Sequence, residues 1–373
     1  MNFIVSTSSF LTALNQAAHA VNSSSPQPSL RCLKLSAENH ALTVTGSDGD
    51  LSIKAVMNAD EENRLHIIEE GEILIESRYL MEIVKKIDSN DVQVEILDGA
   101  LTKFAGNSVV YKINGTQARD YPNIDFSVPE NTLTMKAGLL AEIIEQTNFA
   151  AAVKETKPIL MGVNFRCADG QLTCTATDSY RLARKIVPFE SAAPFRLTIP
   201  SRALNEVKSV LLGNPDQEII MAMSEKKATF KNDTLTMQTR LLDGAYPETD
   251  RLIPKEFEYK LSIDKMDLVR AIDRTTFIKS DNMAVNRLQC SANDIILTNK
   301  SQEIGEFRET LTGAFEGEEL DISFSANYVM QAARAIPQER LEILFKGEMK
   351  PFIICSAEDD SLIQLVLPVR TYN

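Results

Sequence analysis

Acidic side chains occur in two close pairs that have the chemistry to hold a divalent cation or to act as a general acid and base. The pairs are Asp48 with Asp50 and Asp359 with Asp360. Carboxylate oxygens are ligands that Mg²⁺ accepts, so a metal-dependent hydrolase using Asp48, Asp50 or Asp178 is one hypothesis. Both pairs lie in sequence typical of hairpin turns, where Asp side chains bond the local backbone instead. We expect solvated turns at both pairs, and we expect Asp178, which matches Asp48 in an internal repeat, to shape a turn.

Other signatures of catalysis or metal binding are missing from the sequence. It has no Gly-rich phosphate loop, no G-x-S-x-G and no H-E-x-x-H, and His19, His40 and His66 do not share metal-ligand spacing. The cysteines are odd in number and scattered without a C-x-x-C pair, which favours reduced thiols packed as small apolar groups. These thiols are Cys32, Cys167, Cys174, Cys290 and Cys355. We expect no catalytic residue, no metal and no cofactor.

The stretch from Thr177 to Ala183, TDSYRLA, has side chains that indicate binding instead. Two stretches occupy the same place in the repeat, residues 46–52 (GSDGDLS) and 297–305 (LTNKSQEIG), and neither has a Tyr-Arg-Leu run. Tyr and Arg concentrate where a protein buries a partner's side chains. The sequence therefore predicts a recognition surface here; the alternative is a surface loop whose aromatic residue covers part of the core. The segment from Val366 to Arg370 is apolar almost to the chain end, which indicates a docked segment.

The chain repeats the order helix, strands, helix, strands three times. The clearest repeated element is a short helix with apolar residues at i, i+1, i+4, i+5 (i+7 in the middle copy) and i+8, a face wide enough to pack on a sheet. It recurs about every 125 residues. Its apolar residues are Tyr79, Leu80, Ile83, Val84 and Ile87, then Ala203, Leu204, Val207, Val210 and Leu211, and then Tyr328, Val329, Ala332, Ala333 and Ile336. A β-like run ending in Ser precedes each copy, and we expect Ser77, Ser201 and Ser325 to cap these helices.

Another helix opens each unit of the repeat, over residues 10–21, 139–149 and 265–277. Between the two helices an alternating strand follows a turn rich in Asn, Asp or Gly, as in a hairpin. These strands begin at Leu42, Leu172 and Ile295, and further alternating strands begin at Val92, Glu218 and Leu341. Two Pro-containing connectors, DYPNIDFSVPEN and YPETDRLIPKEF, separate three predicted domains, 1–127, 128–254 and 255–373. The connectors are short and contain few Gly or Ser residues, so we predict a rigid arrangement.

Composition places the chain among ordinary soluble globular proteins. Its 373 residues are 44% hydrophobic and 24% charged. A chain of this length is too long for one core and long enough for two or three domains. No run reaches the roughly 18 apolar residues of a membrane helix, and the start MNFIVSTSSF lacks the features of a signal peptide. We expect a cytoplasmic protein that does not contact the membrane.

A net charge of −13 argues against tight binding to nucleic acid, because affinity for phosphates comes from Lys and Arg. A protein that must stay mobile along DNA can nevertheless have this charge. Basic residues recur on the second helix of successive units, which favours one surface that is less negative than the whole. They are Arg78, Lys85 and Lys86, then Arg202 and Lys208, and then Arg334.

From Met1 to Asn373 the chain resembles the bacterial DNA polymerase III sliding-clamp family, the β subunits. Two motifs carry the resemblance, ATDSYRLA at 176–183 and LPVRTY at 367–372. The resemblance implies an α+β fold of three DNA-clamp domains, each with two helices packed on antiparallel sheet. It also implies a homodimer that joins head to tail into a six-domain ring around double-stranded DNA. Such a ring is not an enzyme; it slides, stays with the nucleoid, and docks the polymerase III α subunit, the clamp loader and other replication and repair proteins.

The resemblance also implies a groove for a partner peptide between domains two and three, where a short motif inserts one or two apolar side chains. The groove residues are Leu160, Thr177, Tyr180, Arg181, Leu182, Pro247, Arg251, Leu252, Met283, Val366, Leu367, Pro368, Val369 and Arg370. Two features depart from other clamps: Met283 stands where an aromatic residue often occurs, and Tyr372 and Asn373 extend the chain past the motif.

For the dimer interface the resemblance indicates Tyr111 and Ile113 of domain one against Phe277 and Ile278 of domain three; core packing is the alternative role for each. The DNA-facing residues are predicted to be Arg78, Lys85, Lys154, Arg202, Lys208 and Arg334. The loop at 22–29 (NSSSPQPS), which should approach DNA, has no basic residue. A repeat-built adaptor that binds peptides without encircling DNA remains the alternative function.

Overall fold

The computed structural model describes residues 1–129, 131–154, 157–190, 193–279 and 283–370, and it has six α-helices and 26 β-strands within these ranges. All of the paired strands are antiparallel. The chain divides into unit 1, Met1–Ala141 with Asn205–Leu241, and unit 2, Glu142–Leu204 with Leu242–Asn373. Within the described ranges, no helix combines the length and apolar character that a membrane crossing needs.

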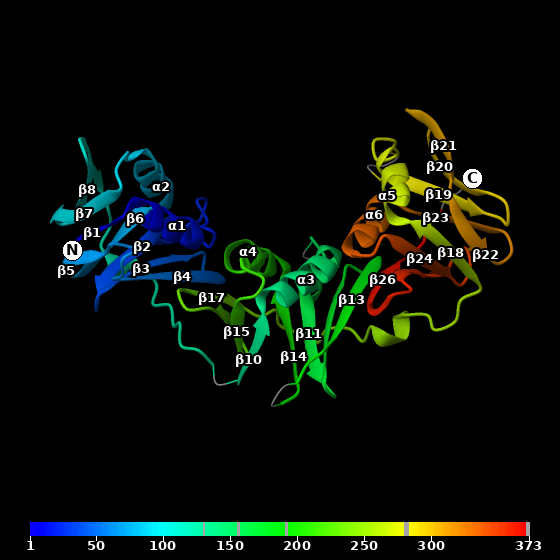
Figure 1. The fold of residues 1–373 in the computed structure, drawn as a ribbon, viewed down its shortest axis with the longest axis horizontal. Coiled ribbons are helices and arrows are strands. Elements are labelled where there is room, and N and C mark those ends of the chain that lie inside the picture. The colour runs from blue at the N-terminus through cyan, green and yellow to red at the C-terminus, as the bar shows by residue number, and fades with distance from the viewer. Residues whose placement is uncertain (130, 155–156, 191–192, 280–282, 371–373) are drawn as a thin grey trace. The chain divides into compact units, whose positions relative to one another are not determined.

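Unit 1 contains two sheets and two complete helices (Figure 1). The smaller sheet has the order β5-β1-β7-β8-β9. Its strands are β1 (Asn2–Ser6), β5 (His66–Glu69), β7 (Asp91–Asp98), β8 (Leu101–Gly106) and β9 (Val109–Asn114). The larger sheet has the order β10-β15-β16-β17-β4-β3-β2-β6. Its strands are β2 (Cys32–Glu38), β3 (Ala41–Ser47), β4 (Leu51–Asn58), β6 (Gly71–Glu76), β10 (Asn131–Lys136), β15 (Glu218–Met223), β16 (Lys227–Lys231) and β17 (Leu235–Arg240). Helix α1 (Thr7–Ala18) packs against β3, β4 and α2 (Ser77–Lys86).

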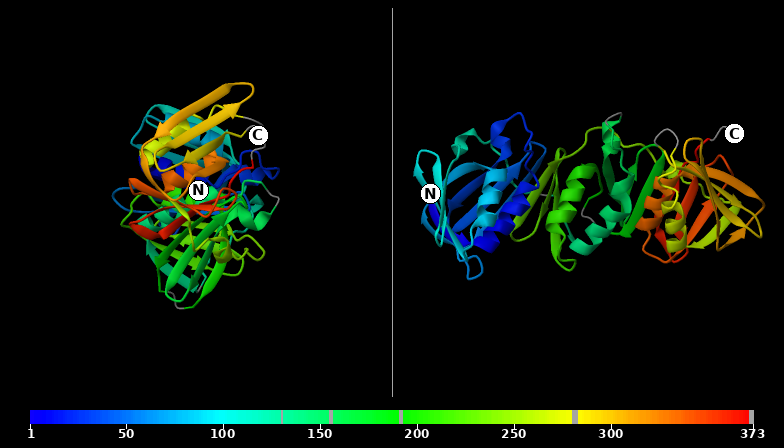
Figure 2. Two further views of the ribbon diagram at one scale, coloured as in Figure 1. Left: turned by 90° about the vertical axis from the view of Figure 1, so that its right-hand side faces the viewer. Right: turned by 90° about the horizontal axis from the view of Figure 1, so that it is seen from above.

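Unit 2 also contains a larger sheet, a smaller sheet and two complete helices. Its larger sheet has the order β14-β11-β12-β13-β26-β25-β24-β18-β22, and its smaller sheet the order β21-β20-β19-β23. The larger sheet contains β11 (Gly162–Ala168), β12 (Gln171–Thr177), β13 (Arg181–Pro188), β14 (Phe195–Pro200), β18 (Tyr259–Asp264), β22 (Gly313–Glu316), β24 (Arg340–Phe345), β25 (Phe352–Ser356) and β26 (Asp359–Val366). The smaller sheet contains β19 (Val285–Cys290), β20 (Ile295–Ser301), β21 (Gly305–Leu311) and β23 (Leu320–Ser325). Helices α5 (Lys265–Asp273) and α6 (Ala326–Ala335) lie side by side (Figure 2).

The division between the units runs through α3 (Ala137–Thr147) and α4 (Ser201–Leu211). Five short 3-10 helices complete the described structure. They are η1 (Pro28–Arg31), η2 (Ala118–Asp120), η3 (Asn148–Ala150), η4 (Pro158–Met161) and η5 (Asp250–Leu252).

The predicted threefold order of elements is confirmed. The opening helices are α1, α3 and α5, and the second helices are α2, α4 and α6. The hairpin β2–β3 has both loop residues at positive φ, Asn39 and His40, and the hairpin β11–β12 repeats this with Asp169 and Gly170. Positive φ at both loop positions suits the right-handed twist of the paired strands. The hairpin β19–β20 has a longer loop, residues 291–294.

The three opening helices are anchored in one way. The backbone amide of the first residue in each donates to a carbonyl just before a strand: Thr7 to Asn90 at 3.0 Å, Ala137 to Gln217 at 2.8 Å and Lys265 to Glu339 at 2.8 Å. The accepting residues precede β7, β15 and β24, which the sequence repeat places in equivalent positions. Because the first amides of a helix have no partner inside it, this contact satisfies one of them in every copy.

The prediction that Ser caps the second helices is wrong. Ser201 is the first residue of α4, one position after the place of a cap. Ser77 is the first residue of α2, one position too late to cap it, and no side chain caps that helix. Ser325 does occupy the cap position of α6, but its hydroxyl makes no cap hydrogen bond. The amide of Ala326 instead donates to the carbonyl of Ala284 at 2.9 Å, so the neighbouring strand segment supplies the acceptor.

The five cysteines are free thiols, and four of them are buried, which confirms their role as small apolar groups. Burial raises the pKa of Cys32 to about 11 and that of Cys290 to about 12. A thiol with so high a pKa carries almost no thiolate at neutral pH and is a poor nucleophile.

The larger sheet of each unit continues across a predicted domain boundary. In unit 1, β17 pairs with β4, from Leu235 opposite Ala55 to Thr239 opposite Leu51. In unit 2, β13 pairs with β26, from Arg181 opposite Val366 to Lys185 opposite Leu362. The boundaries 127/128 and 254/255 stay a prediction, since pairing along the sheets does not mark them.

The connector between the first two repeats lies on the larger sheet of unit 1. Lys227 Nζ of β16 donates to Asp125 Oδ2 at 3.1 Å, and Lys54 Nζ of β4 lies 5.0 Å from the centre of the Phe126 ring. Tyr121 and Ile124 pack with Leu30, Cys32, Leu74 and Ala118. These contacts involve strands of both repeats, so within unit 1 the connector is a packed segment.

Helix α1 approaches β3 so closely that only glycine fits at position 46. A Cβ added to Gly46 would lie 2.1 Å from the carbonyl oxygen of Ala17 and 3.1 Å from Cγ2 of Val21. Backbone atoms cannot yield as a flexible side chain can, so the helix would have to move.

We therefore expect Gly46→Ala to lower the free energy of unfolding by about 2 kcal/mol, within the range seen for overpacked cores. The midpoint of urea unfolding measures this loss. Gly213→Ala is the matched control, because a Cβ there meets nothing within 4 Å; it should change the midpoint little. Equal midpoints for the two variants would contradict the close approach.

Candidate functional site

The TDSYRLA stretch forms a turn between β12 and β13 that Asp178 builds, as predicted. Its Oδ1 accepts from the backbone amides of Tyr180 at 2.9 Å and Arg181 at 3.0 Å. Thr177 Oγ1 donates to the Arg181 carbonyl and accepts from the Ser179 amide at 3.2 Å. Five residues thus fix each other by local hydrogen bonds.

The first repeat contains the same turn between β3 and β4. Asp48 Oδ1 accepts from the amides of Asp50 at 3.0 Å and Leu51 at 2.8 Å. Ser47 Oγ donates to the carbonyl of Leu51 and accepts from the amide of Gly49. The backbone design is therefore common to both repeats, and the two turns differ in their side chains: Tyr180, Arg181 and Leu182 replace Asp50, Leu51 and Ser52.

One backbone position has a less favourable conformation in the second copy of the turn. Gly49 has φ +99° and glycine adopts this value freely, whereas Ser179 has φ +78° in the same place. A non-glycine residue in this region costs of order 1 kcal/mol. Such strain persists only where the surroundings hold it, and it is concentrated at functional sites.

The side chain of Arg181 is buried beneath the turn. Only 8% of the residue is exposed. Its Nε donates to Asp178 Oδ2 at 3.1 Å, its Nη2 donates to the Phe149 carbonyl at 2.5 Å, and its Nη1 donates to Gln331 Oε1. The guanidinium carbon also lies 4.5 Å from the centre of the Tyr328 ring and 5.3 Å from that of Phe149. This set of contacts joins the turn to η3 and α6.

The C-terminal segment continues β26 beside the turn. The amide of Leu367 donates to the Tyr180 carbonyl at 2.9 Å, and the amide of Val369 donates to the Ser323 carbonyl at 2.7 Å. Val366 is buried, Pro368 and Val369 are half-buried, and Leu367 is 36% exposed. The predicted docking of this segment is confirmed as far as Val369, and Arg370 is exposed. Residues 371–373, including Tyr372 and Asn373, lie outside the described residues.

The segment from Tyr246 to Leu252 lies against the same sheet. Arg196 of β14 donates to the Tyr246 carbonyl at 2.9 Å and to Glu248 Oε1 at 2.7 Å. Asp250 forms ion pairs with Arg184 at 3.3 Å and with Arg166 at 3.6 Å. The pKa of the Tyr246 phenol is raised by burial, and Thr177 and Asp178 are among the groups that act on it. This segment therefore lies next to the turn.

Of the predicted groove residues, one set is buried and another is exposed, and Pro368 and Val369 are half-buried. Leu160, Thr177, Arg181, Leu182 and Val366 are buried. Tyr180 (63% exposed), Leu252 (54%), Met283 (45%) and Leu367 expose apolar surface, and Pro247, Arg251 and Arg370 are also exposed. The exposed set offers contact area to a partner directly. The buried set supports it, and Arg181 in particular has its donors engaged within the chain.

The sequence did not identify four residues as part of this site: Phe149, Ser323, Tyr328 and Gln331. Phe149 ends a predicted helix, and Tyr328 belongs to the apolar face of another. Gln331 and Ser323 have no signal of their own, because they act through partners far away in sequence.

The predicted interface residues lie in different settings. Tyr111 and Ile113 are half-buried on β9, an edge strand of the smaller sheet of unit 1. Phe277 is 66% exposed, but Ile278 is only 4% exposed, and its carbonyl accepts from Asn299 Nδ2 at 3.2 Å. Ile278 therefore packs in the core, which is the alternative role considered for it.

The six basic residues predicted to face DNA are all exposed. Arg78 and Lys85 lie on α2 and Lys208 on α4, in unit 1; Arg202, also on α4, Lys154 and Arg334 lie in unit 2. Arg78 Nε is 2.8 Å from Glu76 Oε1, and Arg334 is 3.9 Å from Asp273. Exposed pairs of this kind contribute roughly 0–1 kcal/mol, so these cations exchange partners at little cost.

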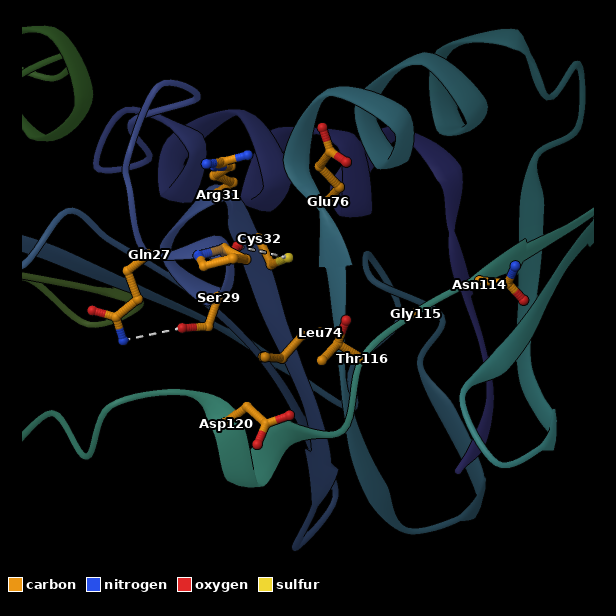
Figure 3. Close-up of a pocket in the computed structure, with 11 residues that line it drawn as sticks. Gln27, Ser29, Arg31, Cys32, Leu74, Glu76, Asn114, Gly115, Thr116 and Asp120 are labelled. Carbon is orange, nitrogen blue, oxygen red and sulfur yellow. Dashed lines mark hydrogen bonds between the residues drawn. The ribbon is translucent and has the colours of Figure 1, made fainter.

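The loop at 22–29 borders a pocket of about 490 Å³ in unit 1 (Figure 3). Gln27 Nε2 donates to Ser29 Oγ at 3.2 Å on one side, and Thr116 and Asp120 line another. The loop has no cation of its own, but Arg31 just beyond it donates from Nε to the Ser25 carbonyl at 2.6 Å. This contact fixes the loop in its conformation.

Asp48 and Asp50 lie in a turn, as expected, but Asp359 and Asp360 are the first residues of β26. Asp359 also forms an ion pair with the buried Lys185 at 3.4 Å, so the expectation of a solvated turn is wrong for this pair. Asp359 Oδ1 accepts from the amide of Ser361 at 2.9 Å in the hairpin β25–β26. Across the described ranges, no group of three or more His, Cys, Asp or Glu side chains is placed to hold a metal ion.

The two matching turns allow a direct comparison of stability. Asp178→Ala removes two backbone hydrogen bonds and the carboxylate partner of a buried guanidinium, so we expect a loss of roughly 3 kcal/mol. Asp48→Ala removes the equivalent backbone bonds, but Leu51 stands where Arg181 supplies the buried guanidinium, so we expect roughly 1–2 kcal/mol. Urea unfolding of both variants measures the difference; a loss at Asp48 as large as that at Asp178 would refute the role assigned to Arg181.

Comparison with known proteins covers the whole chain. Family models of the DNA polymerase III beta subunit match residues 1–125 (N-terminal domain), 134–248 (central domain) and 250–370 (C-terminal domain). The chain is 33% identical to the beta sliding clamp of Staphylococcus aureus and 32% to that of Halalkalibacterium halodurans, each over 100% of both proteins. Its fold matches the DNA polymerase sliding clamp of Bacillus subtilis (TM-score 0.95, 31% identity, 100% of both chains) and the beta subunit of Streptococcus pyogenes (0.94, 28%, 100% of both). The chain therefore belongs to the bacterial beta sliding clamp family, the beta subunits of DNA polymerase III.

Proposed function

We propose that this protein is a DNA sliding clamp without catalytic activity. Two copies join head to tail into a ring of six domains, 1–127, 128–254 and 255–373 from each, and the ring encircles duplex DNA. It slides along DNA at the nucleoid in the cytoplasm and holds the polymerase III α subunit, the clamp loader and other replication and repair proteins. The observation that carries the proposal is the match of all three domain models along one chain.

The charge of the protein supports sliding. A ring is retained on DNA by its topology, so its contacts with phosphates can be few and bridged by water. With a net charge of −13, most of the surface repels DNA. Exposed cations on α2, α4 and α6 then supply weak, sequence-independent attraction, which does not pin the ring at one position.

Partners bind, in this proposal, where the turn and the C-terminal segment meet. Tyr180, Leu252, Met283 and Leu367 present exposed apolar surface for one or two side chains of a partner peptide. Two backbone hydrogen bonds hold the segment from Leu367 to Val369 in place, so a partner finds a wall that is already ordered. Order before binding lowers the entropy cost of association.

Ring closure would use Tyr111 and Ile113 of one copy with Phe277 of another. Strand β9 lies at the edge of its sheet, with one row of backbone groups that pairs with no other described strand, and pairing between copies is a common way to cover such an edge. Ile278 would support Phe277 from the core.

Retention on closed DNA tests encirclement. The protein is loaded onto a nicked circular plasmid with a clamp loader and then passed through a sizing column in high salt, where contacts with phosphates are weak. We expect it to remain with the circle and to leave once a restriction enzyme cuts the DNA. An adaptor that binds only peptides would leave in both cases, and either that result or equal retention on linear DNA would refute the proposal.

The groove is tested with Leu367→Asp. Leu367 is partly exposed, so a charge there should leave the fold intact, but it should weaken binding of a polymerase III α peptide at least tenfold by removing apolar contact. Fluorescence anisotropy measures the affinity. Met349→Asp, at an exposed apolar residue elsewhere in unit 2, is the control and should bind normally. Unchanged binding by the Leu367 variant would disprove the groove assignment.

A further inference from the structure

Four arginines gather beside the proposed groove with too few acids to balance them. Arg166, Arg184 and Arg196 come from β11, β13 and β14, and Arg251 comes from η5. The carboxylates that pair with them among the described residues are those of Glu248 and Asp250. The group therefore has two positive charges in excess, in a chain whose net charge is −13. We call these four residues the arginine cluster.

The strand register places two members of the arginine cluster in direct opposition. Arg166 of β11 stands opposite Arg196 of β14. Like charges at opposed positions destabilise a sheet, and the nearby acids relieve the repulsion only in part. Residues that break a local rule without a structural gain are expected at functional sites.

The arginine cluster also has donors to spare. The Nε of Arg184 is buried and has no hydrogen-bond partner among the residues that the structure describes. Arg166 reaches Asp250 only at 3.6 Å and is 47% exposed, and the Arg196 side chain is 39% exposed. The pKa of Glu248 is held below its usual value by the hydrogen bond from Arg196 and by the charges of Arg196, Arg166 and Arg251. Arg251 therefore adds to the same field.

We propose that the arginine cluster binds acidic side chains that flank the groove-binding motif of a partner peptide. This inference rests on the proposed peptide groove. Arg251 belongs to η5 together with Leu252, which is 54% exposed, so a peptide over Leu252 continues onto the cluster. Guanidinium groups form paired hydrogen bonds with carboxylates. Partners with Asp or Glu next to their apolar residues would thus bind in preference to neutral ones.

An acidic peptide fits the arginine cluster better than a nucleic acid does. The arginine cluster adjoins Leu252 and Pro247, which are exposed and apolar. A peptide matches both the apolar residues and the arginines, because one chain supplies apolar side chains and carboxylates a few residues apart; a phosphate backbone supplies charge alone.

The test compares peptides that differ only in flanking charge. A polymerase III α peptide that binds the groove is extended by Asp-Asp or by Asn-Asn, at its N-terminus in one pair and at its C-terminus in the other. Fluorescence anisotropy with the intact protein gives four values of Kd at low salt. For one end we expect the Asp-Asp peptide to bind about three- to tenfold more tightly than its Asn-Asn counterpart.

Two variants locate the effect. Arg166→Gln and Arg196→Gln should each bring the ratio of the two Kd values close to one and change the Asn-Asn value less than twofold. Arg196→Gln also removes the hydrogen bond to the Tyr246 carbonyl, so Arg166→Gln tests the effect of charge more directly. Arg240→Gln is the matched control, because Arg240 forms a similarly long ion pair, 3.7 Å to Asp50, in unit 1; its ratio should match that of the unaltered protein.

The outcomes separate this inference from the proposed function. If the Asn-Asn peptides do not bind at all, the groove itself is wrong. If they bind but charge makes no difference at either end, or if the preference survives in both variants, the inference is overturned. A labelled single-stranded oligonucleotide is tested in parallel; binding that the two variants abolish, without any peptide preference, would assign the arginine cluster to phosphates and also overturn it.

Discussion

Burial of one guanidinium group organises the region that sets the middle repeat apart. Arg181 is almost completely excluded from water, and a carboxylate, a backbone carbonyl, an amide oxygen and two aromatic rings surround its guanidinium group. An isolated charge in such a place would cost several kcal/mol. The partners belong to the turn itself, to η3 and to α6, so the geometry of the turn depends on the packing of all three.

This dependence explains how a common turn acquires a specific surface. The hydrogen bonds around Asp48 and Asp178 are nearly the same, so the backbone needs nothing from Tyr180 or Arg181. Once Arg181 lies beneath the turn, Tyr180 is left on the outside, and its carbonyl accepts from the Leu367 amide. Buried Leu182 completes the packing below. A scaffold present in two repeats thus becomes a site in one of them through three side chains.

The order of elements could be predicted from the sequence because it depends on local pattern. Apolar spacing located all six helices to within a few residues, turn residues located the hairpins, and Asp178 was identifiable as a turn former from its match with Asp48. The contacts of the site were less accessible. Gln331 lies 150 residues from Arg181, and no local pattern encodes that pairing. The Ser caps failed for a related reason, since in α6 the acceptor for the first amide is the distant Ala284 carbonyl.

The sheets that cross the repeat boundaries bear on how the molecule can be divided. The middle repeat contributes β17 to one sheet and β13 to the other, and each pairs with a strand of a neighbouring repeat. Cut out alone, it would expose both strands as bare edges, which are templates for aggregation. The two neighbouring repeats thus cover the edge strands of the middle repeat, and the smallest fragment that stays folded and soluble is larger than one repeat.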